Sequence, residues 1–151
     1  LRAHVDNHSF VVGVDDDTWL TVNNRAFADH AEQGGWTHET LALRIAEPWF
    51  DPEGFRLHER DGRLAGFCWT KVHLESSPVL GEIYVIAVHP RFSGKGLGRA
   101  LTIAGRTHLQ RAGISTGMLH VDADNERAVK LYMSLGFTIT NQQRAFVGDV
   151  N

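Results

Sequence analysis

The sequence predicts an α+β fold, with two helices ahead of a sheet that contains one parallel crossover. A strong hairpin signal, Asp61-Gly62, separates two strand-like runs, and this predicts an antiparallel pair. An apolar strand over 82–88 leads through a glycine turn into a helix and then to a further strand. This strand–helix–strand order predicts the crossover. A chain of 151 residues fits one domain with its own core.

The N-terminal part predicts one strand and two helices. Residues 9–14 are β-branched and aromatic enough for a first strand. Residues 15–17 are aspartates that can cap and charge a helix. The apolar positions of that helix follow a helical period: Trp19, Leu20, Val22, Ala26 and Phe27. Thr37 can cap a second helix, which Pro48 ends. The apolar residues of the second helix are Leu41, Leu43, Ile45 and Ala46.

The middle of the chain predicts the sheet. Residues 55–60 alternate in polarity, residues 63–74 form the returning strand, and residues 82–88 are mostly apolar. An apolar run of this kind is typical of a central strand buried on both faces, and Glu82 at its start is an exception that needs an explanation.

The C-terminal part predicts two more helices and the remaining strands. The helix over 96–112 ends at Gly113, and a strand follows over 118–123. The expected apolar stripe of this helix is Leu97, Leu101, Ala104 and His108. Asn125 can cap a helix over 126–135 that Gly136 ends, and residues 137–147 supply one or two strands. The apolar face of that helix is Ala128, Val129, Leu131, Tyr132 and Leu135.

The glycine turn predicts a site for a phosphate group. Gly94, Gly96 and Gly98 remove the side chains that would keep a ligand from the backbone, and the following helix directs unpaired N–H groups at the same place. The spacing matches neither the P-loop nor the dinucleotide fingerprint. The sequence therefore indicates another phosphorylated cofactor.

Charge and composition exclude several classes. A net charge of −3 gives no general attraction to nucleic acid or an anionic membrane. No apolar run is long enough for a membrane span or a signal peptide. The single cysteine, Cys68, fits a reducing compartment, so we expect a cytoplasmic protein. The histidines show no spacing that predicts a metal site, and we expect none.

Three stretches together resemble the GNAT superfamily of acyl-CoA N-acyltransferases. They are residues 86–90, the turn 93–98 and the run 125–132 with Leu135-Gly136-Phe137 after it. The resemblance implies a mixed, mostly antiparallel sheet flanked by about four helices, with a splayed strand pair that holds acetyl-CoA. The implied acetyl-CoA residues are Ile86, Ala87, Val88, Ser93, Gly94, Lys95, Gly96, Leu97, Gly98, Arg99, Asn125, Glu126, Arg127, Ala128, Val129 and Lys130.

A narrower resemblance covers the chain from about residue 20 onward. Residues 22–27, 32–37, 49–54, 66–73 and 81–85 are similar to the C-terminal, catalytic domain of the mycothiol synthase family. Members of that family carry two GNAT domains and acetylate the cysteinyl amine of cysteinyl-glucosaminyl-inositol in actinobacteria. The resemblance implies that residues 1–151 are one GNAT domain of a longer chain, with an N-terminal GNAT domain as its partner. It also implies that the acceptor faces Glu32, Lys71, Glu82 and His120.

Two residues are predicted to carry the chemistry. An ammonium cannot attack a thioester until it loses a proton, and a carboxylate at an apolar strand can take that proton, so Glu82 is the candidate base. Tyr132 can donate a proton or hydrogen bond to the leaving CoA thiolate, and a backbone N–H near Val88 can polarise the thioester carbonyl.

Each assignment has a structural alternative. Glu82 can be an exposed carboxylate at a strand end, and Tyr132 can be a core tyrosine. Lys71 and Glu32 would ordinarily be solvated, and Cys68 between Phe67 and Trp69 is expected to be a buried, inert thiol.

Two alternative functions stay open at this point. One is N-acetylation of another small amine or of a protein N-terminus. The other is a non-catalytic module that binds acetyl-CoA in support of a partner domain. Glu82 and Tyr132 argue against the second, since a module that only binds needs neither.

Overall fold

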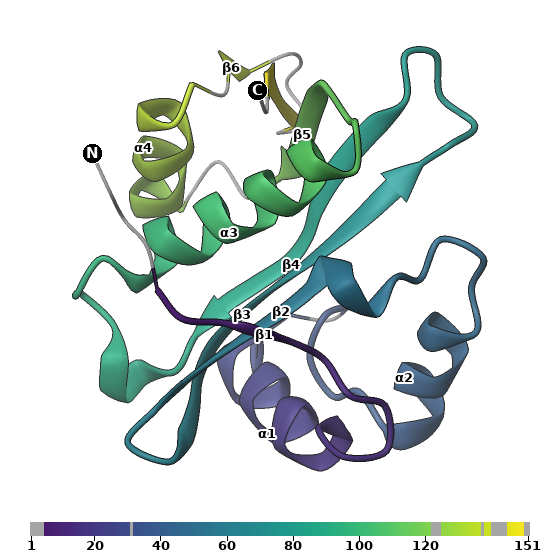
Figure 1. The fold of residues 1–151 in the computed structure, drawn as a ribbon. Coiled ribbons are helices and arrows are strands. Elements are labelled where there is room, and N and C mark those ends of the chain that lie inside the picture. Colours follow the sequence, from purple (N-terminus) through teal and green to yellow (C-terminus); the bar gives the residue numbers. More distant parts are fainter. Residues whose placement is uncertain (1–4, 31, 122–124, 137, 140–144, 150–151) are drawn as a thin grey trace.

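A single sheet with helices on both faces forms the molecule (Figure 1). The structure is a computed structural model and describes residues 5–30, 32–121, 125–136, 138–139 and 145–149. Helices α1 (Asp16–Ala26) and α2 (His38–Ile45) cover one face, and α3 (Leu97–Arg111) and α4 (Glu126–Ser134) cover the other. Within the described part, none of the helices has the length and apolar character to cross a membrane.

The sheet has seven strands in the order β1-β2-β3-β4-β5-β7-β6. All neighbouring pairs are antiparallel except β4 and β5, which α3 connects as the predicted crossover. The strands are β1 (His8–Ser9), β2 (Phe55–Arg60), β3 (Arg63–His73), β4 (Leu80–Val88), β5 (Thr116–His120), β6 (Thr138–Ile139) and β7 (Ala145–Asp149). Two short 3-10 helices, η1 (Pro52–Gly54) and η2 (Pro90–Phe92), complete the described elements.

The predicted first strand over 9–14 is wrong beyond Ser9. Residues 11–14 form a turn with Gly13 at φ 85°, and Val14 is 73% exposed. The backbone N–H groups of Val11 and Gly13 donate to the carboxylates of Asp15 and Asp16. Asp15 makes no side-chain cap bond to α1. The aspartates therefore stabilise the preceding turn, which competes successfully with the β propensity of the valines.

The predicted second helix, hairpin and helix α4 are confirmed. Thr37 and Thr40 form the capping box of α2, and Asn125 caps α4 by accepting from Ala128 N–H at 3.2 Å. Strand β5 ends at His120 in the described part, and residues 122–123 of the predicted strand lie outside the described residues. At the C-terminal end, β6 and β7 supply the two strands expected there.

Helix α3 packs on the sheet through a face that the sequence pattern only partly predicts. Leu97 and Leu101 are buried as expected, whereas Ala104 and His108 are only half-buried. The contact face continues instead through Gly105 and Leu109. A Cβ atom added at Gly105 would lie 2.6 Å from Cys68 Sγ and 3.0 Å from Ile83 Cδ1. The missing side chain thus lets α3 lie close against β3 and β4.

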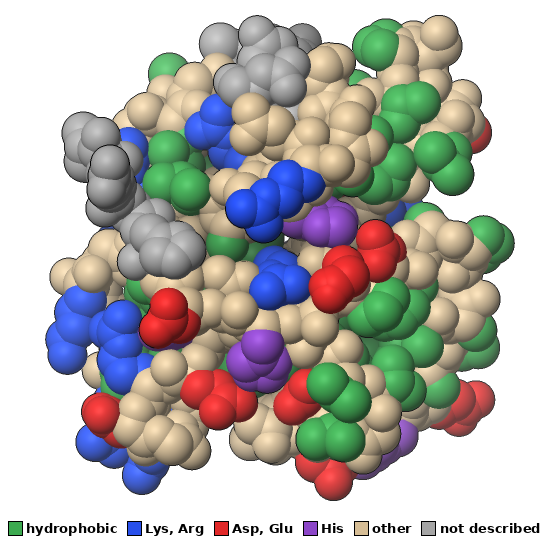
Figure 2. Space-filling view, viewed as in Figure 1, with side chains coloured by type: hydrophobic (Ala, Val, Ile, Leu, Met, Phe, Trp, Pro, Cys, Tyr) green, Lys and Arg blue, Asp and Glu red, His purple; other side chains and the backbone are tan. Residues whose placement is uncertain are grey.

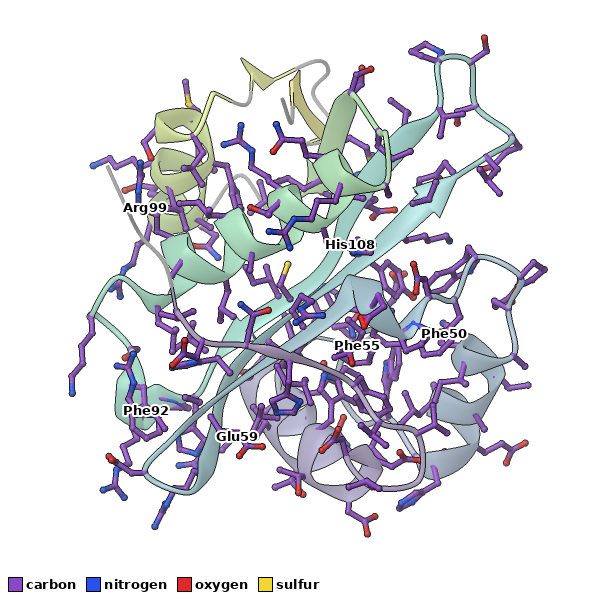
Figure 3. All side chains as sticks on the ribbon, in the orientation of Figure 1. Phe50, Phe55, Glu59, Phe92, Arg99 and His108 are labelled. Carbon is purple, nitrogen blue, oxygen red and sulfur yellow. The ribbon has the colours of Figure 1, made fainter. Side chains whose placement is uncertain are left out.

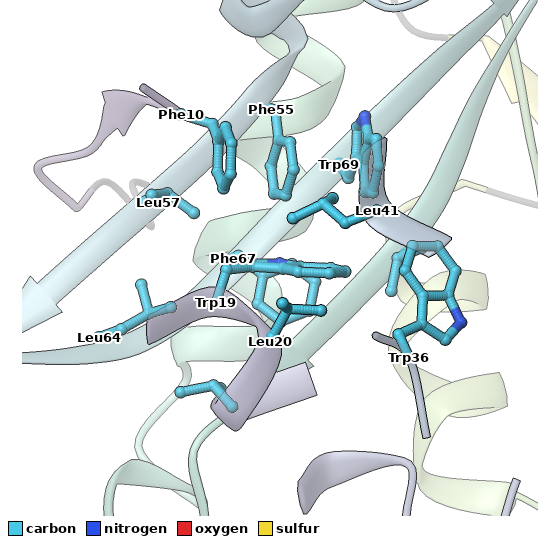
Figure 4. Packing of buried hydrophobic residues seen from close by; sticks show 12 residues of the cluster. Phe10, Trp19, Leu20, Trp36, Leu41, Phe55, Leu57, Leu64, Phe67 and Trp69 are labelled. Carbon is cyan, nitrogen blue, oxygen red and sulfur yellow. The ribbon is translucent and has the colours of Figure 1, made fainter. Parts of the chain in front are cut away.

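An aromatic cluster fills the space between the sheet and helices α1 and α2 (Figure 4). Trp19 is fully buried at its centre and makes edge contacts with Phe55, Phe67 and Trp69 at centroid distances of 5.3 to 5.5 Å. Trp69 stacks on Phe55 with the ring centroids 4.2 Å apart. Burial of such rings and their edge contacts stabilise this half of the core. The cluster continues from Trp69 to Tyr84 and Trp49, which border the site.

The close contact at Gly105 gives a stability prediction. We expect Gly105→Val to lower the free energy of unfolding by about 1 to 3 kcal/mol, because the added side chain overpacks the interface with β3 and β4. Ala104→Val is the matched control, since Ala104 borders an open hollow, and we expect it to cost less than about 1 kcal/mol. Urea denaturation of both variants measures the difference. Helix propensity alone would make Ala104→Val the more destabilising of the two, because valine is a worse helix former than alanine and a better one than glycine. Equal stabilities of the two variants would therefore contradict overpacking at Gly105.

Candidate active site at the divergence of β4 and β5

The site begins where the two parallel strands separate. Strand β4 pairs with β5 only from Leu80 to Ile83, opposite Thr116 to Leu119. From Val85 to Val88, β4 pairs only with β3 on its other side. The sheet therefore opens along the second half of β4, and the backbone on that edge faces the opening.

A bulge lies at the point of separation. Trp69 is opposite Val85 and Thr70 is opposite Ile83, so Tyr84 is an extra residue in β4. Both Tyr84 and Val85 consequently pack with the aromatic cluster, while Ile83 and Ile86 pack with the core under α3. The bulge thus places two consecutive side chains of β4, those of Tyr84 and Val85, on the face covered by α1 and α2.

A groove of about 420 Å³ extends from this opening. It is bounded by the end of β4, the glycine turn, the start of α3 and the start of α4. Its lining residues are Ile86, Ala87, Val88, Ser93, Gly94, Gly96, Leu97, Gly98, Arg99, Asn125, Arg127, Ala128, Leu131 and Tyr132. Most residues that the sequence assigns to acetyl-CoA thus come together. Lys95, Glu126, Val129 and Lys130 are not part of this lining.

The glycine turn has the geometry of an anion site. Gly94 and Gly96 have φ of 77° and 78°, which glycine adopts without strain, and Gly96 is the N-cap of α3. Arg99 lies in the first turn of α3 (Figure 3), and its buried Nε has no hydrogen-bond partner among the described residues. An unpaired buried N–H is costly, so this donor is suited to an anionic ligand in the groove.

Tyr132 borders the groove from α4. It is 7% exposed, and burial raises the pKa of its hydroxyl, with a further contribution from Cys68. The hydroxyl is therefore protonated at neutral pH and can act as a hydrogen-bond donor. The structure bears out the core-tyrosine interpretation and also leaves Tyr132 at the groove.

Glu82 and its neighbours lie on the opposite face of the sheet, which α1 and α2 partly cover. Glu82 is 8% exposed, so the alternative of an exposed strand-end carboxylate is wrong. Lys71 on β3 is its partner in register, and Met118 on β5 is its partner on the other side. Since alternate residues of a strand share a face, His120 lies on the same face as Glu82. His120 is exposed at the end of β5.

Lys71 is held by aromatic rings. Its Nζ lies 5.0 Å from the centroid of Trp49 and 5.5 Å from that of Tyr84. The Tyr84 hydroxyl accepts a hydrogen bond from Arg44 Nε at 3.2 Å. These cation–π contacts keep the ammonium group on this face of the sheet. The simple solvated-charge interpretation of Lys71 is therefore wrong.

Glu32 is exposed in the connection between α1 and α2. Its carbonyl accepts a hydrogen bond from Trp36 Nε1 at 3.0 Å, and Arg44 stacks over the Trp36 ring at 5.3 Å. The structure thus connects Glu32 to the Lys71 cluster only through intermediate residues. No contact between Glu32 and Glu82 is present among the described residues.

The sequence analysis missed three residues of this face: Trp49, Tyr84 and His73. His73 Nε2 lies 2.7 Å from Glu82 Oε1. The sequence of β3 did contain a signal for His73, because His73 is two residues after Lys71 and alternate residues of a strand share a face. Tyr84 carried the same kind of signal, because it is two residues after Glu82 and shares its face, and the bulge changes the alternation only from Val85 onward.

A second hollow, of about 470 Å³, lies on the outer side of α3. It is bordered by Val5, Asn7, Glu53, Arg56, Ala100, Ile103, Ala104, Thr107, His108 and Arg111. Figure 2 shows basic, acidic and histidine side chains close together near the centre of the face in view. Arg56 is engaged by Asn7 and Glu53, and His108 lies 3.7 Å from Asp51. The residues of this hollow are separate from those of the groove.

No three His, Cys, Asp or Glu side chains within the described ranges are grouped as a metal site would require. Cys68 is fully buried, and burial raises the pKa of its thiol to about 12. This bears out the expectation of an inert thiol.

The match to known families agrees with this geometry. The acetyltransferase (GNAT) family profile matches residues 19–137. The chain belongs to the GNAT family. Both the family and the mixed α/β fold predicted from the sequence are therefore confirmed.

Relatives of this GNAT chain carry a more specific name. It is 54% identical over 147 residues to a mycothiol acetyltransferase of Frankia alni, covering 92% of this chain and 44% of the relative. It is 56% identical over 137 residues to a mycothiol acetyltransferase of Streptomyces coelicolor, covering 91% of this chain and 44% of the relative. The chain thus spans less than half the length of these relatives.

Solved structures show the same GNAT architecture. The ribosomal-protein-S18-alanine N-acetyltransferase of Escherichia coli is 27% identical with a TM-score of 0.73, covering 97% of this chain and 94% of that one. The protein yncA of Salmonella typhimurium, solved with its cofactor acetyl-CoA, is 20% identical with a TM-score of 0.73. That match covers 98% of this chain and 95% of yncA, and it supports the fold.

The buried thiol gives a prediction for the GNAT domain. At pH 8 we expect a disulfide reagent to leave Cys68 unmodified in the folded protein, because the thiol is both inaccessible and protonated. In denaturant the same thiol should react completely within minutes. Absorbance of the released reagent group measures both. Rapid labelling of the folded protein would contradict this assignment.

Proposed function

We propose that this chain is an acetyl-CoA-dependent N-acetyltransferase domain that acetylates the cysteinyl amine of cysteinyl-glucosaminyl-inositol, the last step of mycothiol biosynthesis. The observation that carries the proposal is the groove that opens at the divergence of β4 and β5, with the buried carboxylate of Glu82 on the other face of the same strand. The identity of more than 50% to proteins named mycothiol acetyltransferase supports the choice of amine.

The groove fits acetyl-CoA by its donors and its shape. Glycine at 94, 96 and 98 leaves the backbone N–H groups of the turn accessible, and such groups suit a pyrophosphate. The unpartnered Nε of Arg99 and the exposed side chains of Lys95 and Arg127 suit phosphate groups. Residues 86–88 offer the strand edge that β5 leaves open, which suits the amide-containing pantetheine arm. Bound acetyl-CoA supplies the acetyl group as a thioester.

The residues of the chain divide the chemistry between two faces of the sheet. Glu82 takes the proton from the acceptor ammonium, directly or through a water, and this frees the nitrogen lone pair for attack. The Tyr132 hydroxyl donates to the sulfur that leaves. A backbone N–H near Val88 polarises the carbonyl oxygen. We propose no covalent bond between the acetyl group and the protein.

The acceptor side is proposed to include Glu32, Lys71, Glu82 and His120. Lys71, held over Trp49 and Tyr84, offers an ammonium for hydroxyl groups of the sugar or inositol. His120 provides a polar group at the exposed end of β5. Glu32 would border the acceptor site on the side next to α2. We further propose that an N-terminal GNAT domain accompanies this one in a longer chain, and that the reaction is cytoplasmic.

A second candidate function is acetylation of a protein N-terminus or another small amine. The observation in its favour is the 27% identity to an alanine N-acetyltransferase over almost the whole chain. Direct incubation discriminates the two: acetyl-CoA is supplied with cysteinyl-glucosaminyl-inositol or with an alanine-terminated peptide, and mass spectrometry identifies the acetylated product. Product from the peptide alone would overturn the proposed amine and keep the acetyltransferase chemistry.

A substitution of the proposed base tests the mechanism. We expect Glu82→Gln to lower turnover by about 100-fold or more, because the amide cannot accept a proton. Acetyl-CoA affinity, measured by calorimetry, should stay within about twofold, since Glu82 lies outside the groove lining. Glu59→Gln is the matched control on β2, in an exposed pair with His8. Unchanged turnover in Glu82→Gln would remove Glu82 as the base.

A substitution at the turn tests the cofactor assignment. We expect Arg99→Ala to weaken CoA binding by about 10-fold or more, because a buried donor to a phosphate group is lost. Arg111→Ala at the exposed end of the same helix should bind CoA as the wild type does. Calorimetric titration with CoA measures both, and a thermal melt checks that both variants are folded. Equal affinities would exclude Arg99 from the site.

A further inference from the structure

A chain of three side chains connects Glu82 to the protein surface. His73, the last residue of β3, has both ring nitrogens next to carboxylate oxygens. Its Nε2 lies 2.7 Å from Glu82 Oε1, and its Nδ1 lies 3.2 Å from Glu75 Oε1. The side chains of Glu82, His73 and Glu75 are 11%, 21% and 76% exposed. The ring therefore spans the distance between a buried carboxylate and an exposed one.

The two contacts place a carboxylate oxygen at each nitrogen of the ring. An ionised carboxylate can only accept hydrogen bonds, and a neutral imidazole has one N–H. The ring can donate to both carboxylates only as the imidazolium. The hydrogen bond from His73, after that from its own backbone N–H, contributes to a lowered pKa of the Glu75 carboxyl. This agrees with Nδ1 acting as a donor to Glu75.

Glu82 is buried, so the groups in contact with its carboxylate matter for its proposed role as base. A carboxylate in such a position, without a charged partner, favours its neutral form, and a neutral carboxylic acid cannot accept the proton of the acceptor ammonium. Lys71 is opposite Glu82 in register, but its ammonium lies over Trp49 and Tyr84. Within the described part of the chain, the only ion pair of Glu82 is with His73.

In the described part of the chain, the other charged and titratable groups on this face come from four elements. They are Lys71 and Glu75 on and after β3, Tyr84 on β4, His120 on β5 and Arg44 on α2. Arg44 is bonded to the Tyr84 hydroxyl, and among the described residues only Glu75 and Glu82 form ion pairs with His73. Of these groups, His73 is thus the one in direct contact with the Glu82 carboxylate.

We propose that His73 is a positioning residue for the base Glu82: its imidazolium, fixed from outside by Glu75, orients the Glu82 carboxylate and keeps it ionised. The inference rests on the proposed function. In the step itself, an N–H bond of the acceptor ammonium breaks and an O–H bond forms on Glu82, while His73 keeps both of its protons. The nitrogen lone pair becomes available to the thioester, and Glu82 later returns the proton to solvent.

Kinetics of His73 variants test the proposal. His73→Gln retains an amide donor without the charge, and His73→Leu removes both. With acetyl-CoA and cysteinyl-glucosaminyl-inositol, and product measured by mass spectrometry, we expect kcat at pH 7 to fall about 10-fold in His73→Gln and further in His73→Leu. The loss in His73→Gln should shrink as the pH rises toward 9, because hydroxide then deprotonates Glu82 without help from a cation. KM for acetyl-CoA should change less than twofold.

Two further variants separate positioning from folding. Glu75→Gln removes the outer carboxylate, and we expect a smaller loss of kcat with the same pH trend. His8→Gln is the matched control, since His8 pairs with Glu59 at 3.2 Å on an exposed part of the sheet away from Glu82. We expect it to leave kcat and its pH dependence unchanged. An equal loss of kcat at every pH in His73→Gln, or no loss, would overturn the proposal.

A measurement without any acceptor distinguishes this inference from the proposed function. Side-chain ¹⁵N NMR of the protein, with His73 assigned by the His73→Gln spectrum, reports whether each ring nitrogen carries a proton. We expect both nitrogens to be protonated at pH 7 and one to lose its proton in Glu82→Gln. A neutral ring at pH 7 in the wild type overturns the positioning role. A protonated ring with no acetylated product instead supports the pairing and contradicts the proposed amine.

Discussion

The separation of β4 from β5 after Ile83 is the constraint on which the rest of the site depends. A parallel pair that continued to Val88 would use the N–H and C=O groups of β4 and would fill the space that the groove occupies. The separation leaves this edge open to a ligand with its own amide groups. It also brings the turn at 93–98 and the start of α4 to the two sides of one groove.

The sheet divides the site into two chemically different halves. On the α3 side, the groove offers backbone donors, Arg99 and the protonated hydroxyl of Tyr132, all suited to an anionic, sulfur-containing ligand. On the α1 and α2 side, Glu82 and Lys71 lie among aromatic rings and polar partners suited to a hydroxyl-rich amine. Residues from both faces can act together only at the opening, so the opening defines where acetyl transfer would occur.

On the face proposed for the acceptor, the positions of the basic side chains are set by specific contacts and not by the net charge of the chain. Each cation there has a specific partner: Arg44 has the Tyr84 hydroxyl and the Trp36 ring, Lys71 has two rings, and His73 has two carboxylates. Because the rings occupy Lys71, they separate its ammonium from Glu82. Among the described residues, this leaves the Glu82 carboxylate with His73 as its ion-pair partner.

Local patterns in the sequence determined much of this protein by themselves. The glycine turn, the Asp61-Gly62 hairpin and the caps Thr37 and Asn125 each act over a few residues, so their chemistry is readable without the fold. Only the tertiary structure decided the contacts of His73, the aromatic support of Lys71 and the face of Val85. These depend on pairings between strands and on a bulge, and a bulge changes the side-chain alternation that a sequence pattern assumes. Gly105 is a further case. A glycine has no apolar side chain, so it is not counted in the apolar stripe of a helix, although it sets how closely α3 approaches the sheet.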